Sequence, residues 1–239
     1  MGTWWTRALK RVHPEGIPWP ASAVYDAVSG TDIFRRHYAL VAADVRGHGG
    51  DAGRILDIGT GPGWLLPALR VEFPHAELVG VDVSQAMVSR ARRNVAGPGR
   101  GPGGSLQARG GMDGIKVVLA NAQRLPFAAG TFDRVVSTGS IHHWKDAVAG
   151  LAEAHRVLKP GGHALIYDLV RHTPETVRRD LKARFGGLWL TLLWLHSFEE
   201  PFLDPEEMVA LGCRTAFRVE GTRFVGALCC LVLRKGLTG

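Results

Sequence analysis

Two short apolar runs, each carrying an aspartate near its end, constrain this chain more than any other feature. Residues 55–63 read Ile-Leu-Asp-Ile-Gly-Thr-Gly-Pro-Gly, and residues 78–82 read Leu-Val-Gly-Val-Asp. Continuous apolar runs of this length are typical of strands in a parallel sheet that is covered on both faces. Glycines directly after a strand allow a tight turn in which the backbone comes close to a ligand. The two runs therefore predict a nucleotide-cofactor cleft at the carboxyl ends of two strands.

The charge of Asp57 indicates which cofactor this cleft accepts. Asp57 lies two residues before the first glycine, at the end of the first run. A dinucleotide would place its pyrophosphate at this point, and two negative charges in contact repel each other. S-adenosylmethionine has no phosphate and carries a cationic sulfonium and a cationic ammonium. We therefore expect S-adenosylmethionine, and a nicotinamide-dependent dehydrogenase is the disfavoured alternative.

The order of the expected elements indicates an α/β fold. Short apolar strands alternate with helices from Arg54 onward, which is the pattern of a doubly wound, Rossmann-like parallel sheet. Strands are expected at about 55–56, 78–81, 117–120, 135–136 and 164–167, and helices at about 63–73, 84–95 and 144–158. Residues 1–48 are expected to form a helical lid segment, and residues 49–239 one domain with a flexible Gly/Pro-rich loop at 97–114.

The end of the chain predicts an antiparallel pair of strands. Strand-like residues at about 216–220 and 224–233 flank the tripeptide Gly-Thr-Arg at 221–223. A connection this short can only join antiparallel neighbours, because parallel strands need a long crossover. The sheet is therefore expected to close with a hairpin that turns at 221–223.

Four motifs, in order along the chain, resemble those of the class I S-adenosylmethionine-dependent methyltransferases, in their small-molecule branch of ubiquinone/menaquinone-type and methyltransferase type 11-like enzymes. The motifs are Leu-Asp-Ile-Gly-Thr-Gly-Pro-Gly at 56–63, Val-Gly-Val-Asp-Val-Ser at 79–84, Asn-Ala-Gln-Arg-Leu-Pro-Phe at 121–127 followed by Phe-Asp at 132–133, and Leu-Lys-Pro-Gly-Gly at 158–162. A single glycine motif is weak evidence, but four in register are specific. The resemblance implies an enzyme that transfers a methyl group, and a seven-stranded, mostly parallel sheet with an antiparallel last strand.

The resemblance also implies roles for the residues of the first two motifs. Asp57 would attract the ammonium of the cofactor. Gly59, Thr60 and Gly61 would form the turn that passes close to its methionine part, where larger side chains would collide. The carboxylate of Asp82 would accept hydrogen bonds from both ribose hydroxyls, because its two oxygens match two adjacent donors.

The remaining implied contacts involve the adenine and the ammonium. Val83 and Met87 would lie on the two faces of the adenine, and Asn121 and Ala122 would contact its edge through a side-chain acceptor and a backbone amide. Thr138 would offer its backbone carbonyl to the ammonium. The family usually carries Asp at the position of Asn121, so the adenine contact is expected to be weaker here, because the acceptor has lost its charge.

Candidate residues for the methyl acceptor follow the fourth and fifth strands. His142 and His143 lie in the loop after the fourth strand, at the edge where parallel sheets bind ligands. Either is a candidate general base, because an unperturbed histidine titrates at about pH 6.5. Asp168, at the end of the fifth strand, and Tyr25, on the N-terminal helices, are candidates for contact with the acceptor. No metal is expected, because adjacent histidines rarely converge on one ion and a third ligand is not evident.

The charge of the chain leaves alternatives open for its partner. The net charge of +7 permits a nucleic-acid partner, so an RNA or DNA methyltransferase is one alternative. Against it, residues 137–140 read Ser-Thr-Gly-Ser where amino-methylating enzymes of nucleic acids carry an Asn/Asp-Pro-Pro-aromatic run, and no cysteine lies in a suitable loop. A non-catalytic, cofactor-binding protein of the same fold is the other alternative. We expect a small-molecule methyl acceptor, and the oligomeric state is not indicated.

The location in the cell is inferred from cysteines and apolar segments. Three cysteines give no disulfide framework, which is typical of a reducing compartment. Neither a signal peptide nor an apolar run long enough to cross a membrane is visible. A cytoplasmic protein is therefore expected.

Overall fold

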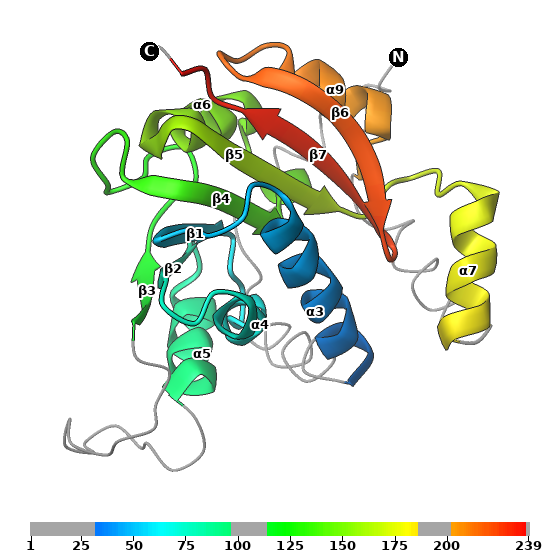
Figure 1. Cartoon of the computed structure of the whole chain (residues 1–239), viewed down its shortest axis with the longest axis horizontal. Coiled ribbons are helices and arrows are strands. Elements are labelled where there is room, and N and C mark those ends of the chain that lie inside the picture. The colour runs from blue at the N-terminus through cyan, green and yellow to red at the C-terminus, as the bar shows by residue number, and fades with distance from the viewer. Residues whose placement is uncertain (1–31, 97–113, 186–201, 238–239) are drawn as a thin grey trace.

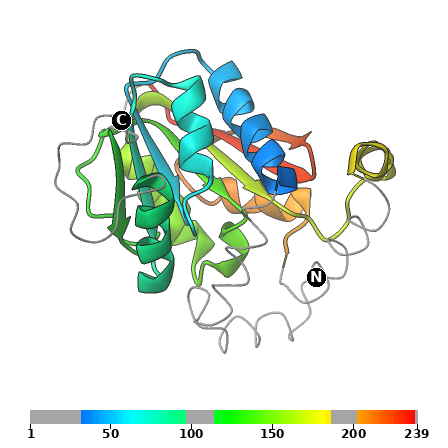
Figure 2. The same cartoon turned by 90° about the horizontal axis from the view of Figure 1, so that it is seen from below.

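The computed structural model describes residues 32–96, 114–185 and 202–237, and Figures 1 and 2 show it from two directions. Its centre is a seven-stranded sheet in the order β3-β2-β1-β4-β5-β7-β6. The strands are β1 (Arg54–Ile58), β2 (Glu77–Asp82), β3 (Ile115–Leu119), β4 (Phe132–Thr138), β5 (Leu158–Asp168), β6 (Arg218–Val225) and β7 (Leu228–Arg234). Strands β1 to β5 run parallel, whereas β7 is antiparallel to β5 and β6. This confirms the predicted fold class, a Rossmann-like, mostly parallel sheet with an antiparallel last strand.

The strand order reverses its direction next to β1, and this reversal determines where a ligand binds. β1 pairs with β2 on one side and with β4 on the other. In doubly wound sheets, ligands bind outside the carboxyl ends of the strands at such a switch point. The turns after β1 and β2 and the loop after β4 all leave the sheet at this edge.

Helices cover both faces of the sheet (Figures 1 and 2). On one face lie α3 (Asp32–Gly47), α4 (Leu65–Glu72) and α5 (Gln85–Ala96), and on the other lie α6 (Ala147–Val157) and α9 (Pro205–Gly212). The helix α7 (Glu175–Phe185) projects from the body of the molecule (Figure 1).

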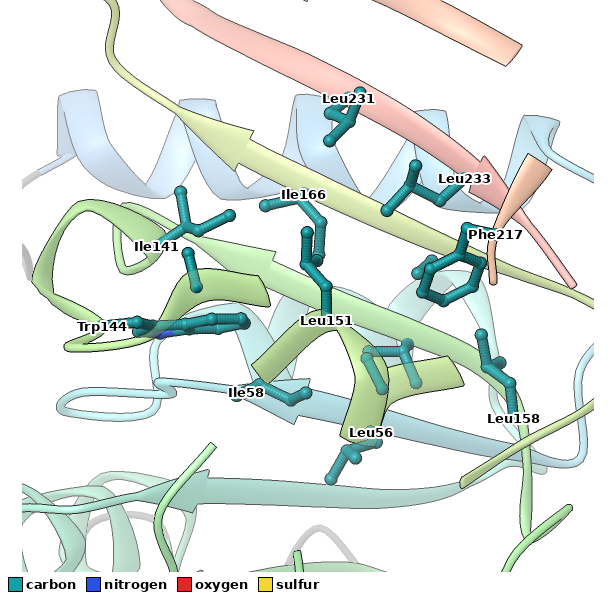
Figure 3. Packing of buried hydrophobic residues seen from close by; sticks show 14 of the residues in the cluster. Leu56, Ile58, Ile141, Trp144, Leu151, Leu158, Ile166, Phe217, Leu231 and Leu233 are labelled. Atoms are coloured by element: carbon teal, nitrogen blue, oxygen red, sulfur yellow. The ribbon is translucent and has the colours of Figure 1, made fainter. Parts of the chain in front are cut away.

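The core on the α6 side is apolar and fully buried. Figure 3 shows Leu151 of α6 among side chains of the sheet, including Ile166 of β5 and Leu231 of β7. Each of these three side chains is completely shielded from water. Burying one such side chain stabilises the fold by roughly 1.5–3 kcal/mol. This packing holds α6 rigidly against the strands whose ends carry the candidate site.

Two helices begin later than the sequence predicted, each for a local reason. α4 begins late enough that Pro67 occupies its first turn, where a missing N–H costs no internal hydrogen bond. α6 begins at Ala147, because the Asp146 carboxylate caps it and accepts a hydrogen bond from the Ala149 N–H at 2.9 Å. The residues Ile141–His143, just before it, form a separate single 3-10 turn.

The C-terminal hairpin forms, but the prediction that it turns at 221–223 is wrong. β6 continues through these residues, and the chain turns instead around Gly226, which has a φ of +58°. Gly221 has a φ of +121°, and the register of the two strands shifts between Val219 and Gly221. The first glycine therefore produces a β-bulge and the second one the turn, since both conformations are open to glycine.

Some predictions lie outside the described residues. These are Tyr25, the lid segment before Asp32, and the loop 97–114 except for its last residue. The described part of the predicted lid segment is α3, which packs against α4. The division of the chain at residue 48 therefore stays a prediction. Among the described residues, no helix has the length and apolar character that crossing a membrane requires.

Candidate active site

The turn after β1 brings the backbone directly against the loop after β4. Gly59 has a φ of +75°, a conformation that glycine adopts without strain. A Cβ atom at this position would lie only 1.9 Å from the Oγ of Ser140. The amides of Gly59 and Thr60 both donate to the carbonyl of Val81, at 2.8 and 2.9 Å, and so fasten the turn to the end of β2. The close approach of the two loops therefore depends on the missing side chain.

Asp57 is a buried carboxylic acid for which the described residues supply no positive partner. The hydroxyl of Thr60 donates a hydrogen bond to its Oδ2 at 2.7 Å. Within residues 32–96, 114–185 and 202–237, no Lys, Arg or His side chain forms an ion pair with it. Burial raises the pKa of Asp57 to about 7, and the charge of Asp82 adds to this effect while the hydrogen bond from Thr60 opposes it. A bound cation would relieve this cost, so the residue fits the ammonium of S-adenosylmethionine.

Asp82, at the end of β2, is held in place by two backbone amides. Its Oδ2 accepts a hydrogen bond from the Gly61 N–H at 2.9 Å, and its Oδ1 accepts one from the Ser84 N–H at 2.8 Å. Burial nevertheless raises its pKa above the ordinary range. Each carboxylate oxygen has a second lone pair. The carboxylate is therefore oriented in advance and retains acceptor capacity for two ribose hydroxyls.

The predicted adenine contacts surround the ends of β2 and β3. Val83 is 39% exposed, whereas Met87 is buried. The Oδ1 of Asn121 accepts a hydrogen bond from the Gln123 N–H at 2.8 Å, so this acceptor is already shared with its own loop. Ala122 is partly exposed and packs against the core. Val83 thus offers the open apolar surface that an adenine face needs.

The end of β4 carries two buried hydroxyl groups that are not satisfied. Among the described residues, the Oγ of Ser137 and the Oγ1 of Thr138 have no hydrogen-bond partner. A buried polar group without a partner costs about 1–3 kcal/mol. Thr138 was predicted to contribute its backbone carbonyl, and the structure adds an unpaired hydroxyl at the same position. Successive side chains of a strand point to opposite faces, so a polar ligand at this strand end could satisfy one of the two hydroxyls.

His142 and Asp168, which the sequence suggested separately, form a buried pair. The Oδ2 of Asp168 lies 2.7 Å from the Nδ1 of His142 and also accepts the His142 backbone N–H at 3.3 Å. The other oxygen, Oδ1, accepts the Leu169 N–H at 2.8 Å. The two side chains are only 5% and 2% exposed. A neutral imidazole that donates from Nδ1 to the carboxylate carries its lone pair on Nε2, which is the arrangement of an oriented general base.

Two further rings pack against the imidazole of His142. The ring centroid of His143 lies 3.9 Å away, and that of Phe202 lies 4.5 Å away. The carbonyl of Phe202 accepts a hydrogen bond from Arg171 at 2.8 Å, which holds this residue in place before α9. Phe202 could not be predicted from the sequence as part of this site, because it lies far from His142 along the chain and has no polar group. The ring of His143 packs beside the pair.

Comparison with known proteins shows the family of the chain. Residues 56–166 match the family described as methyltransferase domain. The demethylmenaquinone methyltransferase of Thermus thermophilus is 35% identical over 177 residues, which cover 70% of this chain and 74% of that relative. The chain belongs to the class I S-adenosylmethionine-dependent methyltransferases.

Other members of this family are also similar to the chain. The ubiquinone/menaquinone biosynthesis C-methyltransferase UbiE of Geobacter sulfurreducens is 38% identical over 180 residues, covering 70% of this chain and 66% of that relative. A methyltransferase structure from Aquifex aeolicus has the same fold, with a TM-score of 0.61 and 19% identity over 83% of this chain and 91% of that one. The chain spans about half the length of several other curated relatives. In the described part of the chain, no three His, Cys, Asp or Glu side chains could together hold a metal ion.

Proposed function

We propose that this chain transfers the methyl group of S-adenosylmethionine to a small molecule with an acidic hydroxyl, such as a hydroquinone. The observation that carries the proposal is the buried pair of His142 and Asp168, which lies at the same sheet edge as Asp57 and Asp82. Relatives named for phytylhydroquinone, menaquinone and ubiquinone methylation are 31%, 35% and 38% identical to the chain. Their names support a quinol-type acceptor.

The proposed role of the cofactor residues is to hold the methyl donor in one position. The cofactor supplies a methyl group bonded to a positively charged sulfur, which makes that carbon electrophilic. Asp57 would bind the ammonium, and Asp82 would bind the ribose hydroxyls. Aligning two reactants in this way contributes up to about 7–11 kcal/mol to lowering the barrier.

The proposed role of His142 is to remove a proton from the acceptor. Its Nε2 would take the hydroxyl proton while the acceptor's oxygen, or the ring carbon beside it, forms a bond to the methyl carbon. The carbon–sulfur bond breaks, and its electron pair remains on sulfur. Asp168 would stabilise the imidazolium that results, because its Oδ2 lies 2.7 Å from Nδ1 and can accept a hydrogen bond from it. If carbon is methylated, the later loss of the ring proton restores the aromatic ring.

The test of this proposal is a screen for release of S-adenosylhomocysteine. The acceptors are hydroquinones and phenols, with RNA and DNA oligonucleotides as the competing class. Turnover with a hydroquinone supports the proposal. Turnover with an oligonucleotide alone, lost at moderate salt, would favour the nucleic-acid alternative. Cofactor binding without turnover on any acceptor would favour the non-catalytic alternative.

Asp82→Ala is expected to weaken the binding of S-adenosylmethionine by more than about tenfold, because it removes charge-assisted hydrogen bonds to the ribose. Isothermal titration calorimetry measures the change. Asp146→Ala is the matched control, because it also removes a carboxylate that accepts a backbone amide, at the start of α6. An unchanged affinity in Asp82→Ala would refute the ribose assignment.

The affinity for S-adenosylhomocysteine is expected to rise as the pH increases from about 6 to about 8. Burial raises the pKa of Asp57 to about 7, so the free protein holds a proton there that the ligand ammonium displaces. Binding near neutral pH should therefore release a proton. Calorimetry in buffers of different ionisation enthalpy measures this release, and Asp57→Asn should abolish it.

The raised pKa of Asp57 also makes the stability of the ligand-free protein depend on pH. Between the unfolded pKa of 3.8 and the folded pKa of about 7, the folded state binds more protons than the unfolded state. The contribution of Asp57 to stability is therefore lost as the pH rises through this window. Urea unfolding of Asp57→Asn should lack this component. A variant with the same pH dependence of stability and binding as the wild type would disprove the assignment to Asp57.

A further inference from the structure

We propose that an ion pair on α6, formed by Glu153 and Arg156, positions the loop 121–127 for recognition of adenine. This inference rests on the proposed cofactor site, in which Asn121 and Ala122 contact the adenine edge. Neither member of the pair is placed in contact with the cofactor. Both would act through the backbone of the loop.

The ion pair binds both backbone polar groups of one loop residue. The Leu125 N–H donates to the Oε2 of Glu153 at 2.8 Å, and the Leu125 carbonyl accepts from the Nη2 of Arg156 at 3.0 Å. The carbonyl of Phe127 accepts from the Nη1 of Arg156 at 2.7 Å. Two side chains of α6 therefore hold three backbone groups of the loop 121–127, which connects β3 to β4.

The two side chains also hold each other. Arg156 donates from Nε to Oε1 of Glu153 at 2.6 Å and from Nη2 to Oε2 at 2.8 Å. The hydrogen bond from Arg156 lowers the pKa of Glu153, and the bond to Glu153 raises the pKa of Arg156. Such bidentate, charge-assisted pairs fix geometry as well as charge. Leu151 and Ala154 of the same helix are buried in the core, so the pair stands on a rigid support.

Leu125, whose N–H and carbonyl are bound by the ion pair, lies one tight turn away from the proposed adenine contact. The Arg124 N–H donates to the Asn121 carbonyl at 3.0 Å, which closes a turn immediately before Leu125. On the other side of Asn121, the Ala120 N–H donates to the carbonyl of Asp82 at 2.9 Å. The segment with Asn121 and Ala122 is therefore held between Asp82, the proposed ribose-binding residue, and the ion pair of Glu153 and Arg156. A displacement of Leu125 would pass to Asn121 through a single turn.

The preference for adenine over hypoxanthine depends on the position of the loop 121–127, so it can be used to test that position. The edge of adenine presents an amino donor and a ring-nitrogen acceptor, which match the Asn121 oxygen and the Ala122 amide. Hypoxanthine presents a carbonyl acceptor and an N–H donor at the same places, so both contacts are reversed. The ribose and methionine parts are the same in both ligands. Discrimination between the two bases therefore depends on where the loop lies.

The experiment compares two ligands by titration calorimetry of the whole chain. S-adenosylhomocysteine and its deaminated analogue S-inosylhomocysteine are titrated into the wild type, Arg156→Ala, Glu153→Ala and Arg156→Lys. Lys235→Met is the control, because Lys235 donates to the carbonyls of His155, Arg156 and Leu158 at the end of α6, at 2.9, 3.5 and 2.8 Å, so its removal disturbs the helix end and leaves the side-chain bonds of Arg156 to the loop in place.

The wild type should prefer the adenosyl ligand, and Arg156→Ala should reduce this preference at least about tenfold, the equivalent of one lost hydrogen bond. Glu153→Ala should behave alike, Arg156→Lys should keep part of the preference, and Lys235→Met should keep all of it. An unchanged preference in folded Arg156→Ala overturns the inference, and so does an equal loss in Lys235→Met. A wild type without any preference refutes the adenine assignment in the proposed site, and the inference with it.

Discussion

Gly59→Ala is expected to lower the free energy of unfolding by about 3 kcal/mol and to weaken the binding of S-adenosylhomocysteine at least about a hundredfold. The φ of +75° at this residue strains any L-amino acid, at a cost of about 1–2 kcal/mol. The new Cβ would also lie 1.9 Å from the Oγ of Ser140 and 2.5 Å from its Cβ. That hydroxyl accepts a hydrogen bond from the indole N–H of Trp144 at 2.9 Å, so it cannot move without a further loss.

Gly130→Ala separates the effect of backbone strain from the effect of the collision. Gly130 has a φ of +65°, and a Cβ there would have no atom within 4 Å. The free energy of unfolding of Gly130→Ala should therefore fall only by the cost of backbone strain, about 1–2 kcal/mol, and the affinity for the ligand should stay unchanged. Urea unfolding and calorimetry measure the two quantities. If the two variants lose equal stability and Gly59→Ala still binds the ligand, the close approach of the turn after β1 to the loop after β4 is not required for stability or for ligand binding.

His142→Gln is expected to lower kcat by roughly a hundred- to ten-thousandfold while the affinity for S-adenosylhomocysteine stays unchanged. Glutamine has a side-chain N–H that can still donate to Asp168, but it has no basic nitrogen. This matters because removing the partner of a buried carboxylate costs about 3–5 kcal/mol, and His142→Ala would mix that loss of stability with the loss of the base. The rate is measured as release of S-adenosylhomocysteine with the best acceptor of the screen.

His143→Ala is the comparison for this variant, because His143 is the other candidate base and its ring packs on that of His142, the residue that is bonded to Asp168. We expect it to retain most of the activity. A folded His142→Gln enzyme with the kcat of the wild type would exclude His142 as the base. Loss of activity in His143→Ala alone would transfer the role to its neighbour.

The family and the fold could be predicted from the sequence because their signals are local. Apolar runs define strands that are buried on both faces, and glycines after the first of them define the turn where only a bare backbone fits. Asp57 and Asp82 could be predicted as cofactor-binding residues, because each lies at the carboxyl end of a predicted parallel strand. The same local reasoning failed at Gly221, because a glycine that forms a bulge and a glycine that forms a turn look alike in sequence.

The pairing of His142 with Asp168 was beyond the reach of the sequence. The sequence marks both residues as candidates, but it does not show that the Nδ1 of His142 lies 2.7 Å from the carboxylate of Asp168. Phe202 and the pair of Glu153 and Arg156 carried no signal at all, since their contacts join segments that are distant along the chain. Such contacts depend on how helices settle on the sheet, which is a property of packing and not of any single segment.

The sequence by itself determined the order of strands and helices, the glycine turn and the acids at the strand ends, because these follow from the period and chemistry of neighbouring residues. Only the tertiary structure decided that the carboxylate of Asp168 lies beside His142, that Glu153 and Arg156 hold the loop 121–127, and that Asp57 is buried with no counter-charge from the described residues. Those features arise only when water is removed and side chains from separate strands come within hydrogen-bonding distance, since both a hydrogen bond and a shifted pKa depend on surroundings that an extended chain does not have.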